Sequence, residues 1–174
     1  MKKNVNAFDY AGHICESMKK GILLTTKLDG QVNTMTIGWG KIGIEWGKPI
    51  FIAYVRQSRH TRQMLEGNGE FTVNIPYGDL NSKILGFCGT KSGRDVNKIE
   101  ALNLTLEDPA AISVPGIKEL PLTLECKVIY KQKQDLHAVP AELLEKYYPQ
   151  DANGDQDYHI AYYGEIVGAY LITQ

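Results

Sequence analysis

The sequence has few cysteines, no long apolar run and almost no net charge, and each shortage excludes a class of protein. Its cysteines, Cys15, Cys88 and Cys126, are odd in number, far apart and without a CxxC pair, so neither a disulfide framework nor a zinc knuckle is expected. No histidine stands at metal-ligand spacing from another histidine or a cysteine pair, so no metal site is predicted. No apolar stretch reaches the roughly 18 residues of a membrane-spanning helix, and the N-terminal lysines precede no apolar run that would make a secretory signal. These absences favour a soluble protein of the reducing cytoplasm that does not enter a membrane.

A surplus of basic charge is also absent. The 174 residues carry 19 basic and 20 acidic side chains, for a formal net charge of -1. Proteins that bind nucleic acid normally show a basic surplus or stripe, so we expect a small ligand or a protein partner and no nucleic acid.

No glycine-rich GxGxxG segment follows a predicted strand, so a Rossmann dinucleotide site is not indicated. The length favours one domain over residues 1–174.

Alternating and apolar segments predict about six strands. The turn Leu28-Asp29-Gly30-Gln31 joins the first two as a hairpin. The last is long and interrupted by Gly164 and Gly168, which indicates bulges that help a barrel to close. The predicted strands cover residues 21–26, 32–37, 49–55, 71–75, 122–130 and 159–172.

Short helices are predicted between these strands. One covers about Arg59 to Leu65, with Ser58 as its N-cap and Gly67-Asn68-Gly69 at its end. Others cover 80–87 and, after Pro140, 141–148. Because the strands do not alternate regularly with helices, the fold class is mainly β: an antiparallel, Greek-key, six-stranded split β-barrel with short helical insertions.

Two segments carry candidate binding chemistry. The small-residue strand around Asn33, Thr34, Met35 and Thr36 offers backbone amides and short polar side chains to a flat, polar-rimmed ligand. The segment that follows the next strand offers cations, hydroxyls and a helix start to a phosphate. Its candidates are Arg56, Ser58, Arg59, His60 and Thr61. The alternatives are an ordinary edge strand and a capped helix with Arg59 and Arg62 on a solvated face.

The order of these segments resembles the flavin reductase-like family with the FMN-binding split-barrel fold, especially its flavoredoxin-like branch. The likeness runs from about Gly21 to Lys98. It implies an isoalloxazine ring along Asn33 to Thr36, and a phosphate and ribityl chain held by Arg56 to Thr61. It also implies that Lys91 and Ser92 approach the phosphate while Lys98 steadies their loop. A charged Ser-Gly loop of this kind is by itself most often a turn.

The resemblance further implies an oxidoreductase. FMN would accept hydride or electrons from a reduced donor, with NAD(P)H as a possible co-substrate, and pass them to a flavin, a protein or a small acceptor. No catalytic side chain is predicted, because the hydride chemistry belongs to the cofactor. A homodimer with FMN near the subunit boundary is implied as well. The alternatives are a flavoredoxin-type electron carrier without efficient NAD(P)H turnover, a non-catalytic flavin-binding module, and a barrel for another planar ligand such as haem.

Four further residues have roles that the sequence leaves open or only outlines. Trp39 either shields a flavin or belongs to the core, whereas Trp46 is expected in the core. His159, beside the closing strand, faces the proposed ring. Cys88 lies near the proposed site, although a lone cysteine is usually a small buried hydrophobe.

Overall fold

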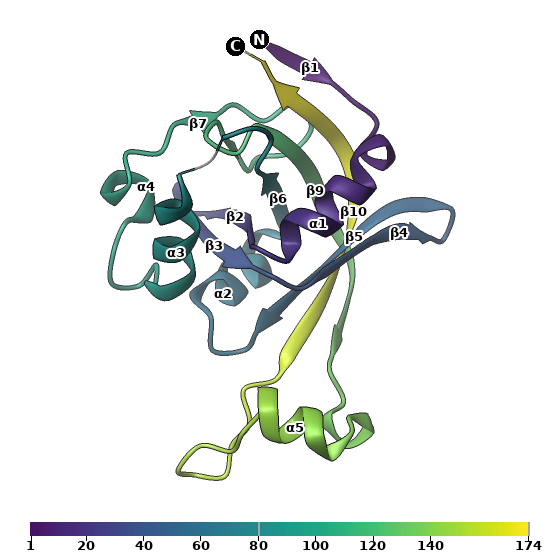
Figure 1. The fold of residues 1–174 in the computed structure, drawn as a ribbon, viewed down its shortest axis with the longest axis vertical. Coiled ribbons are helices and arrows are strands. Elements are labelled where there is room, and N and C mark those ends of the chain that lie inside the picture. Colours follow the sequence, from purple (N-terminus) through teal and green to yellow (C-terminus); the bar gives the residue numbers. More distant parts are fainter. Residues whose placement is uncertain (80, 174) are drawn as a thin grey trace.

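A strongly curved antiparallel sheet forms the centre of the structure, which is a computed structural model that describes residues 1–79 and 81–173 (Figure 1). Neighbouring strands follow the order β3-β2-β6-β9-β10-β5-β4, with β1 added beside β10 and β7 paired with β8 in a separate small sheet. The strands are β1 Lys2–Asn4, β2 Ile22–Leu28, β3 Gln31–Ile37, β4 Gly40–Glu45, β5 Lys48–Arg56, β6 Glu70–Ile75, β7 Leu106–Glu107, β8 Gly116–Ile117, β9 Leu122–Lys133 and β10 His159–Ile172. The helices are α1 Ala11–Met18, α2 His60–Asn68, α3 Ser82–Thr90, α4 Lys98–Ala101 and α5 Ala141–Tyr147, with short 3-10 turns η1 Ala7–Tyr10 and η2 Leu136–Ala138.

The predicted mainly β, antiparallel architecture is confirmed, but the count of six strands was too low. The six predicted strands correspond to β2, β3, β5, β6, β9 and β10. The others were missed because β1, β7 and β8 have only two or three residues each and β4 is interrupted by Gly40 and Gly43. Short or glycine-containing segments give little alternation to recognise.

Two tight turns shape the hairpins of the sheet. The predicted β2–β3 hairpin is confirmed, with Asp29 at φ 49° and Gly30 at φ 79°. The β4–β5 hairpin turns in the same way through Trp46 at φ 52° and Gly47 at φ 69°. This turn places Trp46 at the hairpin tip, where 57% of the residue is exposed. The prediction that Trp46 belongs to the core was therefore wrong, because the turn geometry overrides the tendency of a large aromatic to be buried.

The predicted bending of the closing strand is confirmed. The pairing of β10 with β9 shifts register between Tyr163 and Gly164 and again between Ile166 and Gly168. A Cβ atom at Gly164 would lie 2.5 Å from Cζ of the fully buried Phe71. Glycine is thus required there because the bent strand crosses directly over the core.

Helices α2, α3 and α5 follow the predicted segments but not all of their ends, whereas α1 and α4 were not predicted. Helix α2 begins at His60 and runs to Asn68, with Arg59 as its N-cap and Gly69 in the left-handed conformation as its C-cap. Ser58 is not the cap that was predicted, because its hydroxyl donates to Asp157 instead. The predicted helix near 80–87 is α3, and its expected start at Leu80 lies outside the described residues. Helix α5 follows Pro140 as predicted.

The sheet does not close at the β3 end of its strand path. Strand β3 pairs with β2 along one edge, whereas its other edge faces β5 without a strand ladder in the described residues. Helices α3 and α4 pack beside β3, and α2 lies below it in Figure 1. The β9–β10 connection carries α5 away from the sheet, to the bottom of the same view. The candidate site lies at this open edge.

Candidate functional site

The open edge of β3 presents backbone groups that no strand satisfies. Lys98 Nζ donates to the Thr34 carbonyl at 2.9 Å, which shows that this carbonyl points away from β2. Because backbone groups alternate in direction along an antiparallel strand, the amide and carbonyl of Thr36 point the same way. The edge is therefore suited to hydrogen bonding with the rim of a ligand.

A small hollow of about 140 Å³ lies between β3, the start of α2 and the loop before α4. We call it the cationic hollow. Arg59, Lys91, Arg94 and Lys98 line it, and its lining includes no Asp or Glu. Ser58, Thr61 and Ser92 add hydroxyl groups. The hollow is therefore locally basic, although the chain as a whole has a net charge of only -1.

Lys98 is the most unusual member of the cationic hollow. It is only 4% exposed, and its ammonium group donates to the carbonyls of Thr34 and Cys88 at 2.9 Å each. Burial lowers its pKa, and the charge of Arg59 lowers it further. A buried ammonium group with only carbonyl partners is costly unless an anion approaches it.

The wall of the cationic hollow is tightly packed. The Asn33 amide donates to the Thr61 hydroxyl at 3.0 Å and so ties β3 to α2. A Cβ atom at Gly93 would lie 2.2 Å from Asn33 Oδ1 and 3.0 Å from the His60 ring. His60 Nδ1 is buried and has no hydrogen-bond partner among the described residues. The start of α2 adds backbone amides that no residue of the helix satisfies.

Arg56 and Ser58 perform a different task from Arg59. The Arg56 guanidinium donates to the carbonyls of Asp157 at 2.7 Å and Tyr147 at 2.9 Å. The Ser58 hydroxyl donates to the Asp157 carboxylate at 2.6 Å. These contacts fasten the β9–β10 connection to the end of β5, so part of the predicted phosphate anchor is occupied by the protein itself.

A second hollow of about 170 Å³ adjoins the first, and the two share Met35 and Arg59. We call it the aromatic hollow. Its walls come from β3, the Gly38-Trp39 turn, β5 and the start of β10. The rings of Trp39 and His159 lie 4.8 Å apart in its wall. The two hollows together follow the open edge of β3.

His159 is a neutral member of the aromatic hollow at neutral pH. Burial lowers its pKa to about 4, the Arg56 and Arg59 charges act in the same direction, and Asp157 opposes them. Its Nδ1 atom is hydrogen-bonded to the Tyr148 hydroxyl at 2.9 Å. The imidazole is thereby held in one orientation and can exchange a hydrogen bond through its other nitrogen.

The structure gathers most of the predicted site residues at the open edge. Of the predicted set, those lining the cationic hollow are Asn33, Met35, Ser58, Arg59, His60, Thr61, Lys91 and Ser92. Thr36 and Arg56 line the aromatic hollow. The Thr34 side chain does not reach either hollow, because it is fully buried and bonded to Thr25 and to the Leu24 carbonyl. Strand alternation places it on the face opposite to Asn33 and Met35, which leaves only its backbone at the site. The Thr36 side chain is on the same face as that of Thr34, and its hydroxyl donates to the Leu85 carbonyl at 2.7 Å.

Several lining residues were not among the predicted binding residues. Arg94 and Lys98 stand in the segment that the sequence singled out. Arg94 stays exposed and donates to the Ser58 carbonyl at 3.1 Å, whereas Lys98 is buried, which nothing in the sequence indicates because lysines are mostly exposed. Tyr54 was assigned only to a buried strand. Cys88 is 1% exposed, and burial raises the pKa of its thiol to about 11, so it is the inert buried cysteine that was expected.

The described residues, 1–79 and 81–173, offer no cluster of three His, Cys, Asp or Glu side chains that could hold a metal ion. Within the same ranges no helix has both the length and the apolar character needed to cross a membrane.

Comparison with known proteins identifies the family. Residues 17–174 match the model of the flavin reductase like domain, and the chain belongs to this family of FMN-binding split-barrel proteins. An uncharacterised protein of Archaeoglobus fulgidus is 33% identical over 107 residues, which are 62% of this chain and 59% of that protein. The chain thus spans less than two thirds of that relative.

Solved structures support the fold. A flavoredoxin from Methanosarcina acetivorans is 26% identical, with a TM-score of 0.64, over 88% of this chain and 69% of its own. An FMN-binding domain of a flavin reductase-like enzyme from Shewanella baltica has a TM-score of 0.64 at 17% identity, over 98% of this chain and 77% of its own. The predicted family and split-barrel fold are confirmed.

Proposed function

We propose that the chain binds FMN along the open edge of β3 and acts as an oxidoreductase. The observation that carries this proposal is the cationic hollow, where Arg59, Lys91, Arg94 and Lys98 meet without a carboxylate beside an aromatic-walled hollow. The phosphate would lie in the cationic hollow and the ring in the aromatic hollow, with the Arg59 side chain at the junction.

The residues present fit this cofactor. A phosphate in the cationic hollow would give the Lys98 ammonium an anionic partner. The same hollow is lined by His60, whose buried Nδ1 atom has no hydrogen-bond partner among the described residues. Aligned amides at the start of α2 favour an anion at the same point. The two hollows together match the lower end of the volumes of ligand pockets, about 300 to 1,000 Å³. Family membership supports the same cofactor.

The side chains around the ring would act by positioning and by excluding water. When bound, FMN supplies the hydride and electron chemistry. The outward backbone groups of Thr34 and Thr36 orient the polar rim, and Trp39 with Tyr54 covers the ring. His159 adds no charge at neutral pH, because its pKa is about 4. NAD(P)H is the proposed donor, and a flavin, a protein or a small molecule is the proposed acceptor.

A flavoredoxin-type electron carrier is the second candidate, supported by the likeness to the flavoredoxin of Methanosarcina acetivorans. Steady-state oxidation of NADH and NADPH, with and without added FMN, separates the two. Efficient turnover supports the reductase, and turnover that requires excess flavin identifies flavin as the acceptor. A yellow holoprotein that oxidises neither nucleotide supports the carrier.

The cofactor assignment is tested by comparing FMN with riboflavin, which lacks the phosphate. Arg59→Gln and Arg94→Gln should each weaken FMN by about 10-fold or more and riboflavin by much less, because a hydrogen bond to a charged group contributes about 1.5–3 kcal/mol. Arg62→Gln is the matched control, since Arg62 lies three residues after Arg59, in α2, but does not line the cationic hollow and bonds to the Gln57 carbonyl. Flavin fluorescence titration measures both ligands. Equal losses of affinity for FMN and riboflavin would contradict the placement of the phosphate in the cationic hollow.

We also propose a homodimer, supported by exposed apolar residues at one end of the sheet. The rings of Trp46, Tyr130 and Tyr163 form a cluster, with centroids 4.9 to 6.2 Å apart. Ile44 beside them is 73% exposed. Apolar side chains gathered in this way often mark an interface. Trp46→Glu should shift the protein toward monomer in size-exclusion chromatography with light scattering, whereas Tyr77→Glu, at another exposed aromatic, should not. A monomeric wild-type protein would contradict this proposal.

A further inference from the structure

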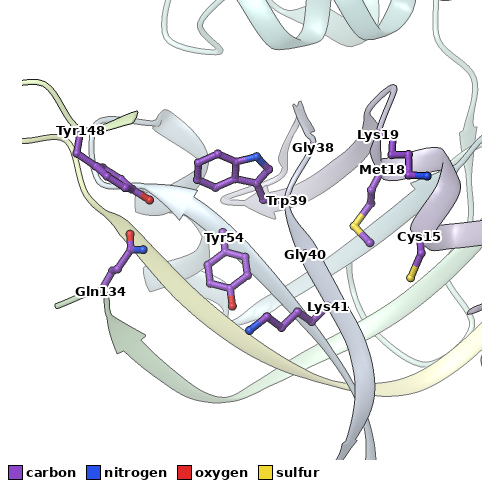
Figure 2. A pocket seen from close by; sticks show the side chains of 10 residues that line it. All are labelled: Cys15, Met18, Lys19, Gly38, Trp39, Gly40, Lys41, Tyr54, Gln134 and Tyr148. Carbon is purple, nitrogen blue, oxygen red and sulfur yellow. The ribbon is translucent and has the colours of Figure 1, made fainter. Parts of the chain in front are cut away.

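A larger pocket of about 540 Å³ opens beside the aromatic hollow (Figure 2). We call it the outer pocket. It shares Gly38, Trp39 and Tyr54 with the aromatic hollow, so these residues form a wall common to both spaces. Its other walls come from the end of α1, the start of β4 and the β9–β10 connection. A molecule in the outer pocket would therefore lie next to the ring proposed for the aromatic hollow.

The outer pocket has aromatic walls that favour a flat ligand. Figure 2 shows the Trp39 indole and the Tyr54 ring in the middle of the pocket, with Tyr148 on one side and Met18 on the other. Trp39 is 41% exposed, although its ring is held by Tyr147 at 5.2 Å and His159 at 4.8 Å. A rigid and partly exposed indole at a cavity wall offers a stacking surface to another aromatic ring.

The charge of the outer pocket favours a single negative charge on that ligand. Lys19 and Lys41 line it, and its lining includes no Asp or Glu. Lys19 is already paired with Glu16 at 2.7 Å. Lys41 lies 5.8 Å from the Tyr54 ring centre and forms no ion pair within residues 1–79 and 81–173. One uncommitted cation suits a monoanion, in contrast to the several cations gathered in the cationic hollow.

Gln134 adds a requirement for a hydrogen-bond donor. Its Oε1 atom is buried and has no hydrogen-bond partner in the described part of the chain. The side chain lines the outer pocket, and its amide end points up between Tyr148 and Tyr54 in Figure 2. An amide oxygen left without a donor is unfavourable, and a hydroxyl or N–H group of a ligand would satisfy it.

We infer that the outer pocket binds a flat aromatic monoanion that carries a hydrogen-bond donor, as a hydroxyaryl carboxylate does. The rings of Trp39 and Tyr54 contact its flat face, Lys41 neutralises its carboxylate and Gln134 Oε1 accepts a hydrogen bond from its hydroxyl group. This inference rests on the proposed function in one respect: the bound molecule would lie next to a flavin only if FMN occupies the aromatic hollow.

The test uses 6-hydroxy-2-naphthoate and two matched compounds. 2-Naphthoate lacks the donor, and 2-naphthol lacks the charge. Isothermal titration of the FMN-saturated protein should show one-site binding of 6-hydroxy-2-naphthoate that is tighter than binding of either matched compound. After the titration, FMN should remain bound, because the two ligands occupy separate spaces. Flavin absorbance should therefore stay with the protein when small molecules are removed by filtration.

Three variants assign the contacts. Lys41→Met should weaken 6-hydroxy-2-naphthoate by about 5-fold while changing 2-naphthol little. Gln134→Leu should remove about 10-fold of the preference for 6-hydroxy-2-naphthoate over 2-naphthoate. Lys19→Met, at the lysine already paired with Glu16, should leave all three affinities within about 2-fold.

Opposite results overturn the inference. These are the absence of binding to the FMN-saturated protein, displacement of FMN by the naphthoate, equal binding of all three compounds, or equal effects of Lys41→Met and Lys19→Met. A failure of FMN to bind at all would refute the proposed function instead. The same titrations on the flavin-free protein would then still decide whether the pocket takes this class of ligand.

Discussion

Replacing Lys98 by methionine separates the effect of its positive charge from the effect of its side-chain packing. The Lys98 ammonium lies at the inner wall of the cationic hollow, 4% exposed, with the carbonyls of Thr34 and Cys88 as its hydrogen-bond acceptors. Methionine has a similar unbranched side chain and fills irregular gaps well. The substitution therefore removes a charge while leaving the packing largely intact.

The expected effect on the flavin-free protein is small. Two hydrogen bonds from a charged donor are lost, each contributing about 1.5–3 kcal/mol. The cost of burying the ammonium, several kcal/mol in typical proteins, is lost as well and acts in the opposite direction. We therefore expect the free energy of unfolding without ligand to change by no more than about 2 kcal/mol.

The expected effect on FMN is large and selective. A charge-assisted hydrogen bond to the phosphate contributes about 1.5–3 kcal/mol, so Lys98→Met should weaken FMN by about 10-fold to 150-fold. Riboflavin has no phosphate and should change by less than about 3-fold. Because burial lowers the Lys98 pKa, wild-type affinity for FMN should also fall as alkaline pH removes this charge, and the variant should lack that contribution.

Flavin fluorescence titrations from neutral to alkaline pH, with urea unfolding as the check on folding, measure these effects. Unchanged FMN affinity in a folded Lys98→Met protein would refute the assignment of Lys98 to the phosphate. Equal weakening of FMN and riboflavin would show that Lys98 acts only by shaping the open edge of β3.

Two further predictions concern His159 and the packing at Gly93. Burial holds the His159 pKa at about 4, below the unfolded value of 6.5, so the unfolded chain takes up the proton first. Its contribution to stability is complete above pH 6.5 and is lost as pH falls toward 4, up to about 3 kcal/mol. Urea unfolding at several pH values should show a shallower acid loss in His159→Phe; an identical pH slope would contradict the pKa shift. Gly93→Ala should weaken FMN, because the new Cβ would lie 2.2 Å from Asn33 Oδ1, whereas Gly12→Ala has no atom within 4 Å and should not. Equal FMN affinity in both variants, by flavin titration, would show that Gly93 does not shape the hollow.

Strand and turn patterns made most of the barrel predictable. Val32 to Ile37 and Phe71 to Ile75 alternate or are apolar over enough residues to indicate strands, and Asp29-Gly30 indicated the hairpin that joins β2 to β3. Trp46 shows where this reasoning stopped. Trp46 is exposed because it lies in the turn at the β4–β5 tip. That turn could not be predicted, because the glycines of β4 hid the strand before it.

The site was predictable as segments but not as individual contacts. The sequence brought Arg56, Ser58 and Arg59 forward together, since all three have the chemistry to hold a phosphate. In the structure only Arg59 and Ser58 line the cationic hollow, while Arg56 and Ser58 bond to the β9–β10 connection about a hundred residues away along the chain. Such partners leave no mark in the local pattern.

The sequence by itself determined the antiparallel sheet, its main hairpin, the bends at Gly164 and Gly168 and the two segments from which the open edge is built. These follow from side-chain alternation and backbone preference, which act between neighbours in the chain. Only the tertiary structure decided that Lys98 is buried at the site, that the Thr34 side chain points away from it, and that Trp39, Tyr54 and Gln134 line a second pocket. Those outcomes depend on which distant strands and loops meet, because burial and charge pairing are properties of the assembled fold.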